Sequence, residues 1–292
     1  MSLAPRVVLV HRRTEYAELL ARHGTRGQTE FFLASRGRDV VELARREERM
    51  RAVIAEVAGA IPLDWRRGSV ERADLARFLF APEDIVVVVG QDGLVANVAK
   101  YLSGQPVIGI NPEPERNSGV LVPHPPSAVA DLLRSRGTQQ RRTMVEIAAD
   151  DGQRLLALNE IYLGNRTHQT SRYTLRAGEV ARERQASSGI LVGTGTGATG
   201  WCGSVWQERH SRLALPGPEE RRLLWFVREA WPSPGTSTAS TEGELTGAPL
   251  TVEVESDQLV AFGDGIESDA IQLGWGQRLT LGLAEQTLCL VR

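Results

Sequence analysis

A run of five β-branched residues, Ile85–Val89, most constrains the fold of this chain, because it ends directly in the turn Gly90-Gln91-Asp92-Gly93. Such a run is typical of a strand covered on both faces, as in a parallel sheet between layers of helices. Ligands of these sheets bind beyond the carboxyl ends of the strands. The Asp92 carboxylate is therefore a candidate to meet a bound hydroxyl or phosphate, although an exposed helix N-cap is the alternative interpretation.

Strand-like and helix-like segments alternate through the first part of the sequence, which predicts an α/β domain. Apolar runs at residues 6–10 and 106–110 indicate two further strands. The expected helices are a long stretch at residues 14–57 interrupted by three glycines, a short helix at 72–80, and a helix at 94–102.

The later part of the sequence changes to short strand-like segments separated by glycine-containing turns, which predicts a mainly antiparallel β domain. Helices are expected there only at residues 200–208 and 219–227, and residues 232–246 are expected to form a loop rich in Ser, Thr, Gly and Pro. The predicted domains are residues 1–137 and 138–275, with a C-terminal segment, 276–292, that returns to the first domain.

The charge balance disfavours some classes of partner. The chain has 34 Lys and Arg against 36 Asp and Glu, a formal net charge of −2, so neither a nucleic acid nor a membrane is the expected partner. Two cysteines form no disulfide framework and residues 1–20 lack the apolar run of a signal peptide, which predicts a cytoplasmic protein. The five histidines show no metal-ligand spacing, so no metal site is expected within the chain.

Three further segments carry residue types suited to nucleotides. The amide of Asn159 and the carboxylate of Glu160 can hold a ribose or a base, although such pairs are more often simply solvated. Residues 187–201 alternate Gly with Ser and Thr before a predicted helix, a pattern that lets backbone amides approach phosphates; an ordinary loop is the alternative. Gly263-Asp264-Gly265 is a second acidic turn, which a hairpin also explains.

Taken in order, these segments resemble the motifs of the NAD kinase family. Gly90-Gln91-Asp92-Gly93 is similar to the family's Gly-Gly-Asp-Gly turn, and Asn159-Glu160 is similar to its Asn-Glu pair. Residues 188–201 are similar to the segment that usually reads Thr-Pro-Thr-Gly-Ser-Thr-Ala-Tyr, and Ser-Ser-Gly with Thr-Gly-Thr-Gly at 187–197 resembles the divergent, mitochondrial-type branch. Residues 109–119, 226–229 and 264–265 also resemble that branch, so the resemblance covers nearly the whole chain.

The resemblance implies a Rossmann-like N-terminal α/β domain, a C-terminal antiparallel β domain and an active site between them. Family members transfer the γ-phosphate of ATP, or in some cases polyphosphate, to the 2′-hydroxyl of the adenosine ribose of NAD, giving NADP. Mg²⁺ would arrive with ATP, and homodimers or homotetramers are usual. The resemblance implies Asp92 as general base, and as nucleotide-binding residues Gly90, Gln91, Gly93, Asn159, Glu160, Ser188, Gly189, Thr194, Thr196, Gly197, Thr199, Trp201 and Asp264.

Two departures from the family pattern lie in the first acidic turn, where Gln91 replaces a glycine and Leu94 replaces a threonine. If the family glycine has a positive φ, Gln91 costs on the order of 1 kcal/mol. This motivates an alternative function, a catalytically weak relative that binds NAD or NADP as a sensor or regulatory subunit. A diacylglycerol-type lipid kinase shares the acidic turn, but Asn159-Glu160 argues against it; a generic Rossmann dehydrogenase fits least.

Overall fold

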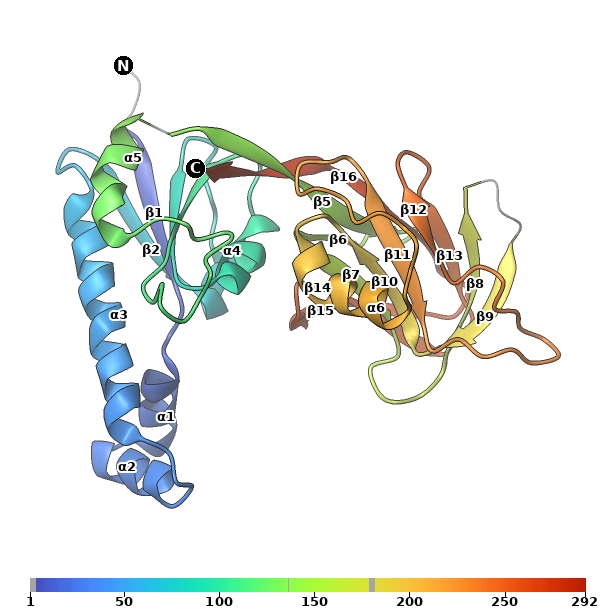
Figure 1. Ribbon diagram of the computed structural model, residues 1–292, viewed down its shortest axis with the longest axis horizontal. Helices are drawn as coiled ribbons and strands as arrows, with labels where there is room; N and C mark the ends of the chain where they lie inside the picture. Colours follow the sequence, from blue (N-terminus) through green and yellow to red (C-terminus); the bar gives the residue numbers. More distant parts are fainter. Residues whose placement is uncertain (1–3, 136, 179–181) are drawn as a thin grey trace. The chain divides into compact units, whose positions relative to one another are not determined.

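The computed structural model describes residues 4–135, 137–178 and 182–292. The chain divides into two compact units (Figure 1). The first unit comprises Met1–Gln140 together with Cys289–Arg292, and the second comprises Arg141–Leu288.

A parallel sheet forms the centre of the first unit. Its strand order is β2-β1-β3-β4, and the last residues of β16 pair in parallel with β4. Every residue of β3 is buried, as the run of β-branched residues predicts. The strands are β1 (Arg6–His11), β2 (Arg66–Glu71), β3 (Ile85–Val89), β4 (Pro106–Ile110) and β16 (Arg278–Val291).

Helices cover both faces of this sheet, with α3 and α4 on opposite sides (Figure 1). Val53 and Val57 of α3 pack with Val129 of α5 over the alternate residues of β3 and β4 that point toward them. The helices are α1 (Glu15–His23), α2 (Arg26–Ala34), α3 (Val40–Ala60), α4 (Asp92–Ala99) and α5 (Val129–Ser135), with 3₁₀ turns η1 (Arg72–Arg77) and η2 (Pro126–Ala128).

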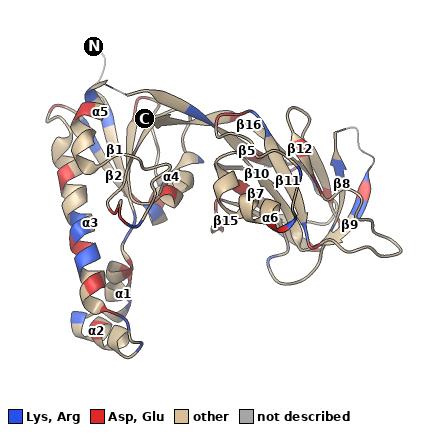
Figure 2. Ribbon diagram, viewed as in Figure 1, with Lys and Arg blue, Asp and Glu red and all other residues tan. Residues whose placement is uncertain are grey.

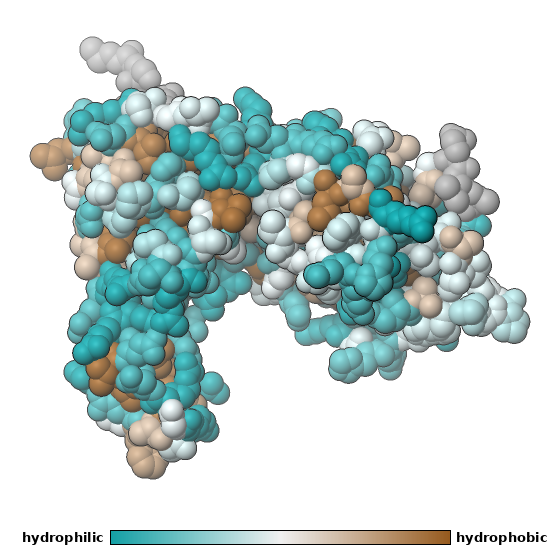
Figure 3. Space-filling model, viewed as in Figure 1, coloured by the Kyte–Doolittle hydropathy of each residue, from teal (hydrophilic) through white to brown (hydrophobic). Residues whose placement is uncertain are grey.

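The helices α1 and α2 form a small cluster with the start of α3. Tyr16, Leu33 and Leu43 are buried in it, and hydrophobic side chains also reach the surface near α1 and α2 (Figure 3). Basic and acidic residues both occur along α3 (Figure 2), so the exposed side of this helix is a solvated surface of mixed charge.

The second unit is a sandwich of two largely antiparallel sheets. One contains β16-β13-β8-β9 with β5 and β6, the other β12-β11-β10-β7-β14-β15. Alternate residues of both sheets form a single apolar core between them. The elements are β5 (Gln139–Ala149), β6 (Arg154–Ala157), β7 (Glu160–Gly164), β8 (Ser171–Ala177), β9 (Glu183–Ser187), β10 (Gly189–Gly193), η3 (Gly197–Thr199), α6 (Trp201–Glu208), β11 (Leu223–Arg228), β12 (Glu242–Leu245), β13 (Leu250–Val254), β14 (Gln258–Gly263) and β15 (Ile266–Gly274).

The predicted combination of an α/β fold with an antiparallel β fold is confirmed, but two local predictions are wrong. Residues 219–227 were expected to be helical, whereas β11 is a strand between β10 and β12. Its apolar run is buried on both faces, because Trp225 faces the inter-sheet core and Phe226 packs under α6; such a run has no helix or strand periodicity. The expected loop at 232–246 contains β12.

In the described part of the chain, no helix is both long and apolar enough to cross a membrane.

Candidate functional site

The first acidic turn lies at the carboxyl end of β3, and Asp92 opens α4. Gln91 is the N-cap residue and has φ −98° and ψ 166°. This is extended backbone that any residue adopts, so the conformational cost considered for Gln91 does not arise. Leu94 is buried and packs against Gly90, where a Cβ would lie 3.0 Å from Leu94 Cδ2.

The Asp92 carboxylate binds backbone amides of a loop that follows β4. Its Oδ1 accepts hydrogen bonds from the N–H groups of Leu121 at 2.7 Å and Val122 at 3.2 Å, and its Oδ2 accepts one from Val120 at 3.1 Å. The alternative in which Asp92 caps its own helix is therefore wrong. The carboxylate therefore accepts three hydrogen bonds from the backbone, out of the roughly four that its lone pairs allow.

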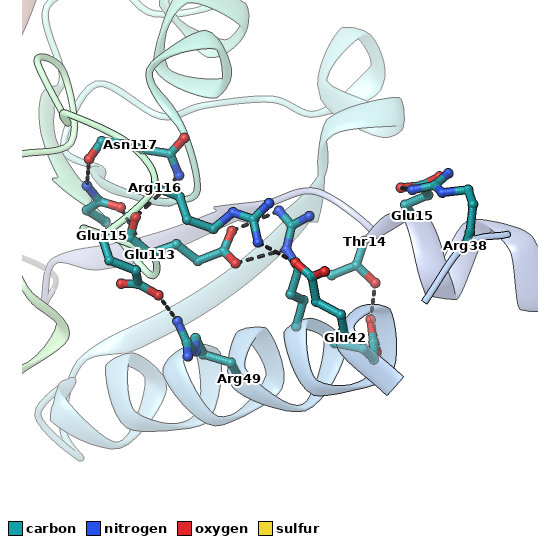
Figure 4. Close-up of polar contacts among 12 residues, drawn as sticks. Thr14, Glu15, Arg38, Glu42, Arg49, Glu113, Glu115, Arg116 and Asn117 are labelled. Atoms are coloured by element: carbon teal, nitrogen blue, oxygen red, sulfur yellow. Dashed lines mark hydrogen bonds and ion pairs between the residues drawn. The ribbon is translucent and has the colours of Figure 1, made fainter. Parts of the chain in front are cut away.

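The preceding loop, residues 111–119, is tied to α3 by ion pairs (Figure 4). Arg46 donates to both carboxylate oxygens of Glu113 at 2.9 Å each, and Glu113 is only 6% exposed. Arg49 pairs with Glu115, and Arg116 on the loop pairs with Glu42 on α3. The loop that Asp92 contacts is thus held from two sides.

Gly93 is the open position of this turn. A Cβ added there would meet nothing within 4 Å, and the residue is exposed. Among the described residues, no side chain caps the first turn of α4, which leaves this helix start accessible to an anion.

In the second unit, Asp264 fixes the Asn-Glu segment. Asp264 has φ +54° in the turn between β14 and β15. Its Oδ2 accepts from the Leu158 N–H at 2.9 Å and its Oδ1 from the Asn159 N–H at 2.7 Å, while its own N–H donates to the Glu160 carbonyl at 3.1 Å. The turn therefore connects two strands and also fixes the backbone of residues 158–160; we call this set of contacts a clamp.

Thr194 joins the same segment to the Gly/Thr loop. Its N–H donates to the Asn159 carbonyl at 2.9 Å, and its hydroxyl donates to the Leu158 carbonyl at 2.5 Å. The same hydroxyl accepts the N–H groups of Thr196 at 3.1 Å and Gly197 at 3.3 Å. Thr194 is completely buried, so its side chain serves to join these backbone segments.

The glycines of this loop permit close packing within the unit. A Cβ at Gly197 would lie 2.3 Å from the Asn159 carbonyl oxygen, and one at Gly195 would lie 2.1 Å from the Gly217 carbonyl oxygen. The buried guanidinium of Arg142 donates to the Thr196 hydroxyl at 3.5 Å. The glycines of this loop are therefore needed for close packing, whether or not the loop also binds a phosphate.

Glu160 is a titratable group of this network whose acidity is altered. It pairs with Gly193 across the sheet and lies on the same face of β7 as Tyr162. Burial, together with the charge of Asp264, raises the pKa of Glu160 from 4.5 to about 7. Among the described residues, its carboxylate makes no side-chain hydrogen bond or ion pair.

Aromatic side chains lie on the face of the sheet that carries Glu160. Trp201 stacks on Tyr162 with ring centroids 5.6 Å apart, and Phe262 lies 5.1 Å from Tyr162. The Arg228 guanidinium lies over the Trp201 ring at 5.2 Å. Trp201 is half-buried and already has two partners, so a base that stacks on it must share the ring with them.

The remaining predicted residues flank this face. The Ser188 N–H donates to the Arg228 carbonyl at 2.9 Å, and Gly189 has φ +119°, a conformation that favours glycine. Thr199 is exposed, and its hydroxyl donates to the Thr196 carbonyl at 3.2 Å. Each unit thus carries its own group of predicted residues: Gly90, Gln91, Asp92 and Gly93 in the first, the others in the second.

The described residues include no group of three or more His, Cys, Asp or Glu that could hold a metal ion. Neither Cys202 nor Cys289 forms a disulfide with a described residue, and both are buried. Burial raises the pKa of the Cys202 thiol to about 12, with a further contribution from Glu160, so Cys202 is a packing residue beside that carboxylate.

A solved structure resembles the chain over almost its whole length. It is an NAD kinase from Archaeoglobus fulgidus in complex with ATP, with a TM-score of 0.56, 16% sequence identity, and coverage of 98% of this chain and 93% of that one. The chain has an NAD kinase fold. The sequence matches no protein-family model and no curated protein.

Sequence reasoning missed the residues that hold the site in place. Asp92 accepts hydrogen bonds from the backbone of residues 120–122, and the pair Arg46–Glu113 ties the preceding loop to α3. Arg142 donates a hydrogen bond to the Thr196 hydroxyl. No local signal could have indicated the pair Arg46–Glu113, because both residues lie in polar stretches and are 67 positions apart in the sequence.

Proposed function

We propose that this chain is an NAD kinase-like phosphotransferase that moves the γ-phosphate of ATP to the 2′-hydroxyl of the adenosine ribose of NAD, giving NADP. The observation that carries the proposal is the network of the second unit. Residues 158–160, Thr194 to Gly197, and Asp264 are linked by direct hydrogen bonds although they lie far apart in sequence. These are the segments by which the sequence resembles the family, and a chance likeness of short motifs would not bring them together.

Phosphate binding has support in both units. No side chain in the described ranges caps the first turn of α4 or of α6, and first-turn N–H groups attract anions. Gly93 leaves open space at the start of α4. The archaeal enzyme of similar fold was solved with ATP, which supports ATP as the donor.

Mg²⁺ would supply charge neutralisation on the transferring phosphoryl group. Since the described residues contain no cluster that could hold a metal, we expect the nucleotide phosphates to provide most of its ligands. The chain would then act mainly by positioning: Asn159 and Glu160 hold the NAD ribose, and the backbone near Gly93 and Thr199 holds phosphates.

Asp92 is the general base that the resemblance implies, and its contacts support a second role in shaping the site. Its carboxylate keeps residues 120–122 beside the start of α4, so its replacement should disturb the donor side. We expect the reaction in the cytoplasm, where the buried thiols of Cys202 and Cys289 stay reduced.

The test is formation of NADP from NAD, ATP and Mg²⁺, measured with an NADP-specific dehydrogenase. Asn159→Ala should lower the rate about tenfold, the loss of one hydrogen bond of ~1.5 kcal/mol. Asn165→Ala is the matched control, and this variant should keep the wild-type rate. The Asn165 side chain accepts a hydrogen bond from the Thr167 N–H, which lies outside the network. Folded protein that binds NAD without turnover would favour the sensor, and phosphorylation of diacylglycerol but not NAD would favour a lipid kinase.

A further inference from the structure

The helices α1 and α2 form a groove that contains none of the candidate nucleotide residues. The two helices are joined at Gly24 and Thr25, and the Thr25 hydroxyl caps α2 by accepting the Gln28 N–H at 3.3 Å. Within the first unit, α2 lies at the end of α3 away from the parallel sheet (Figure 1). The groove is therefore a surface separate from the acidic turn that follows β3.

The helix α2 buries one face and exposes the other. Thr29 and Leu33 are buried, and Leu33 packs into the cluster with α1 and the start of α3. Gly27, Phe31 and Ser35 recur at every fourth residue on the opposite face and are exposed, Phe31 by 76%. A phenylalanine that stays this exposed while it lines a groove is typical of an interaction surface.

The groove has a volume of about 560 Å³ and runs between this exposed face of α2 and the last turn of α1. A Cβ added at Gly27 would meet nothing within 4 Å, so an approaching segment can come close to the backbone of α2 there. Phe32 contacts both the His23 ring, with centroids 4.4 Å apart, and the Arg36 guanidinium, 3.8 Å from the Phe32 centroid. The groove therefore has an ordered aromatic lining.

The rim of the groove is positively charged. Arg22 and Arg36 both line it, and neither forms an ion pair with a described carboxylate, whereas the neighbouring Arg26 pairs with Glu30 at 2.7 Å. Among the described residues, no Asp or Glu lines the groove. Because arginine forms its strongest hydrogen bonds with carboxylates, this rim favours an acidic partner.

The charges also decide between two occupants. If α2 paired with the same helix of a second copy, the Arg22 and Arg36 side chains of both copies would come together, and like charges repel. An acidic segment of another protein would instead pair with both arginines. The exposed face from Gly27 to Ser35 is about 12 Å long, so a helix of two to three turns covers it.

We propose that the groove between α1 and α2 is a docking site for an acidic amphipathic helix of a partner protein. Leucine or aromatic side chains of that helix, spaced three or four residues apart, pack on Phe31 and over Gly27. Its carboxylates pair with Arg22 and Arg36. Aromatic and arginine side chains carry much of the binding energy of protein interfaces, and this groove presents both. The docking site does not depend on the proposed phosphotransferase activity.

The test is a fluorescence anisotropy titration of the full chain with a labelled synthetic peptide. The peptide is a helix of about four turns with Leu and Trp on one face and Glu on the other, and we expect a Kd below ~1 mM. Phe31→Ala should weaken binding at least tenfold. Binding to the wild type should weaken several-fold between 50 and 500 mM NaCl, and Arg22→Glu should remove much of this salt dependence.

Two matched controls lie elsewhere on the first unit. Leu79→Ala removes a side chain that is 88% exposed, and Arg77→Glu reverses an exposed charge; both variants should bind the peptide like the wild type. Circular dichroism should show the same helix content in every variant, because the replaced side chains are exposed. A peptide with Lys in place of Glu should not bind.

Three results would overturn the proposal. The first is equal binding of the acidic peptide to the wild type and to Phe31→Ala, or no binding up to 1 mM. The second is self-association in sedimentation velocity that Phe31→Ala abolishes, which would assign the groove to a second copy of this chain. The third is co-sedimentation of the wild type, but not of Phe31→Ala, with phosphatidylglycerol vesicles, which would assign it to a membrane surface.

Discussion

Replacing Glu160 with Gln is expected to stabilise the second unit, and only at higher pH. Burial and the charge of Asp264 raise the pKa of Glu160 from 4.5 to about 7. At pH 4 the carboxyl is protonated in both the native and the unfolded state, so a neutral amide changes the free energy of unfolding little. Above pH 7 the group is ionised in both states, and the native state carries the cost of the buried charge.

The size of the effect follows from the shift. A change of about 2.5 pKa units corresponds to about 3 kcal/mol. Because the pKa of this acid is raised in the native state, wild-type stability falls as the pH rises from 4.5 to 7. Glu160→Gln should therefore unfold like the wild type at pH 4 and be about 3 kcal/mol more stable at pH 8.5.

Urea unfolding followed by tryptophan fluorescence measures this difference, since five of the six tryptophans belong to the second unit. Glu267→Gln replaces an exposed glutamate on β15 and should show no such pH dependence. If Glu160→Gln were stabilised equally at pH 4 and pH 8.5, or not at all at pH 8.5, the argument would be refuted. Ionised Glu160 would then not destabilise the native state. A group that destabilises its own fold is expected at a functional site.

Three further predictions test the contacts of the site. Thr194→Val should cost about 2–4 kcal/mol, because valine leaves buried backbone groups without the hydroxyl, while Thr199→Val at an exposed position should cost under ~1 kcal/mol; thermal unfolding compares them. Gly197→Ala places a methyl 2.3 Å from a backbone oxygen and should destabilise by about 1–3 kcal/mol. Gly93→Ala has room and should fold normally but weaken ATP binding in calorimetry, and an unchanged affinity would contradict phosphate approach there. Asp92→Asn should speed hydrogen exchange at residues 120–122, and unaltered protection would contradict the clamp.

Elements with a clear local signal could be predicted from the sequence. The run Ile85–Val89 is β-branched throughout and is buried on both faces, and the glycines at 24 and 37 do separate three helices. The strand β11 could not be predicted, because Leu-Leu-Trp-Phe-Val is apolar on both faces and has the length of a short helix or a strand. The segment forms a strand because it pairs with β10 and β12.

The candidate residues could be selected from the sequence, but their contacts could not. Asn159 and Thr194 were expected to face a nucleotide; the Thr194 hydroxyl instead bonds three backbone groups. Asp264 contacts residues that lie 105 and 106 positions away, a distance that no local pattern reveals. Tertiary contacts decide whether such a side chain faces a ligand or the protein.

The two acidic turns share one structural use, and this affects how their variants are interpreted. Asp92 and Asp264 each direct a carboxylate at consecutive backbone N–H groups of another segment. An asparagine at either position replaces an acceptor with a donor, which disturbs that segment. Loss of activity in Asp92→Asn is therefore expected whether Asp92 removes a proton or only holds a loop. Only a change in the pH dependence of the rate separates a base from a clamp.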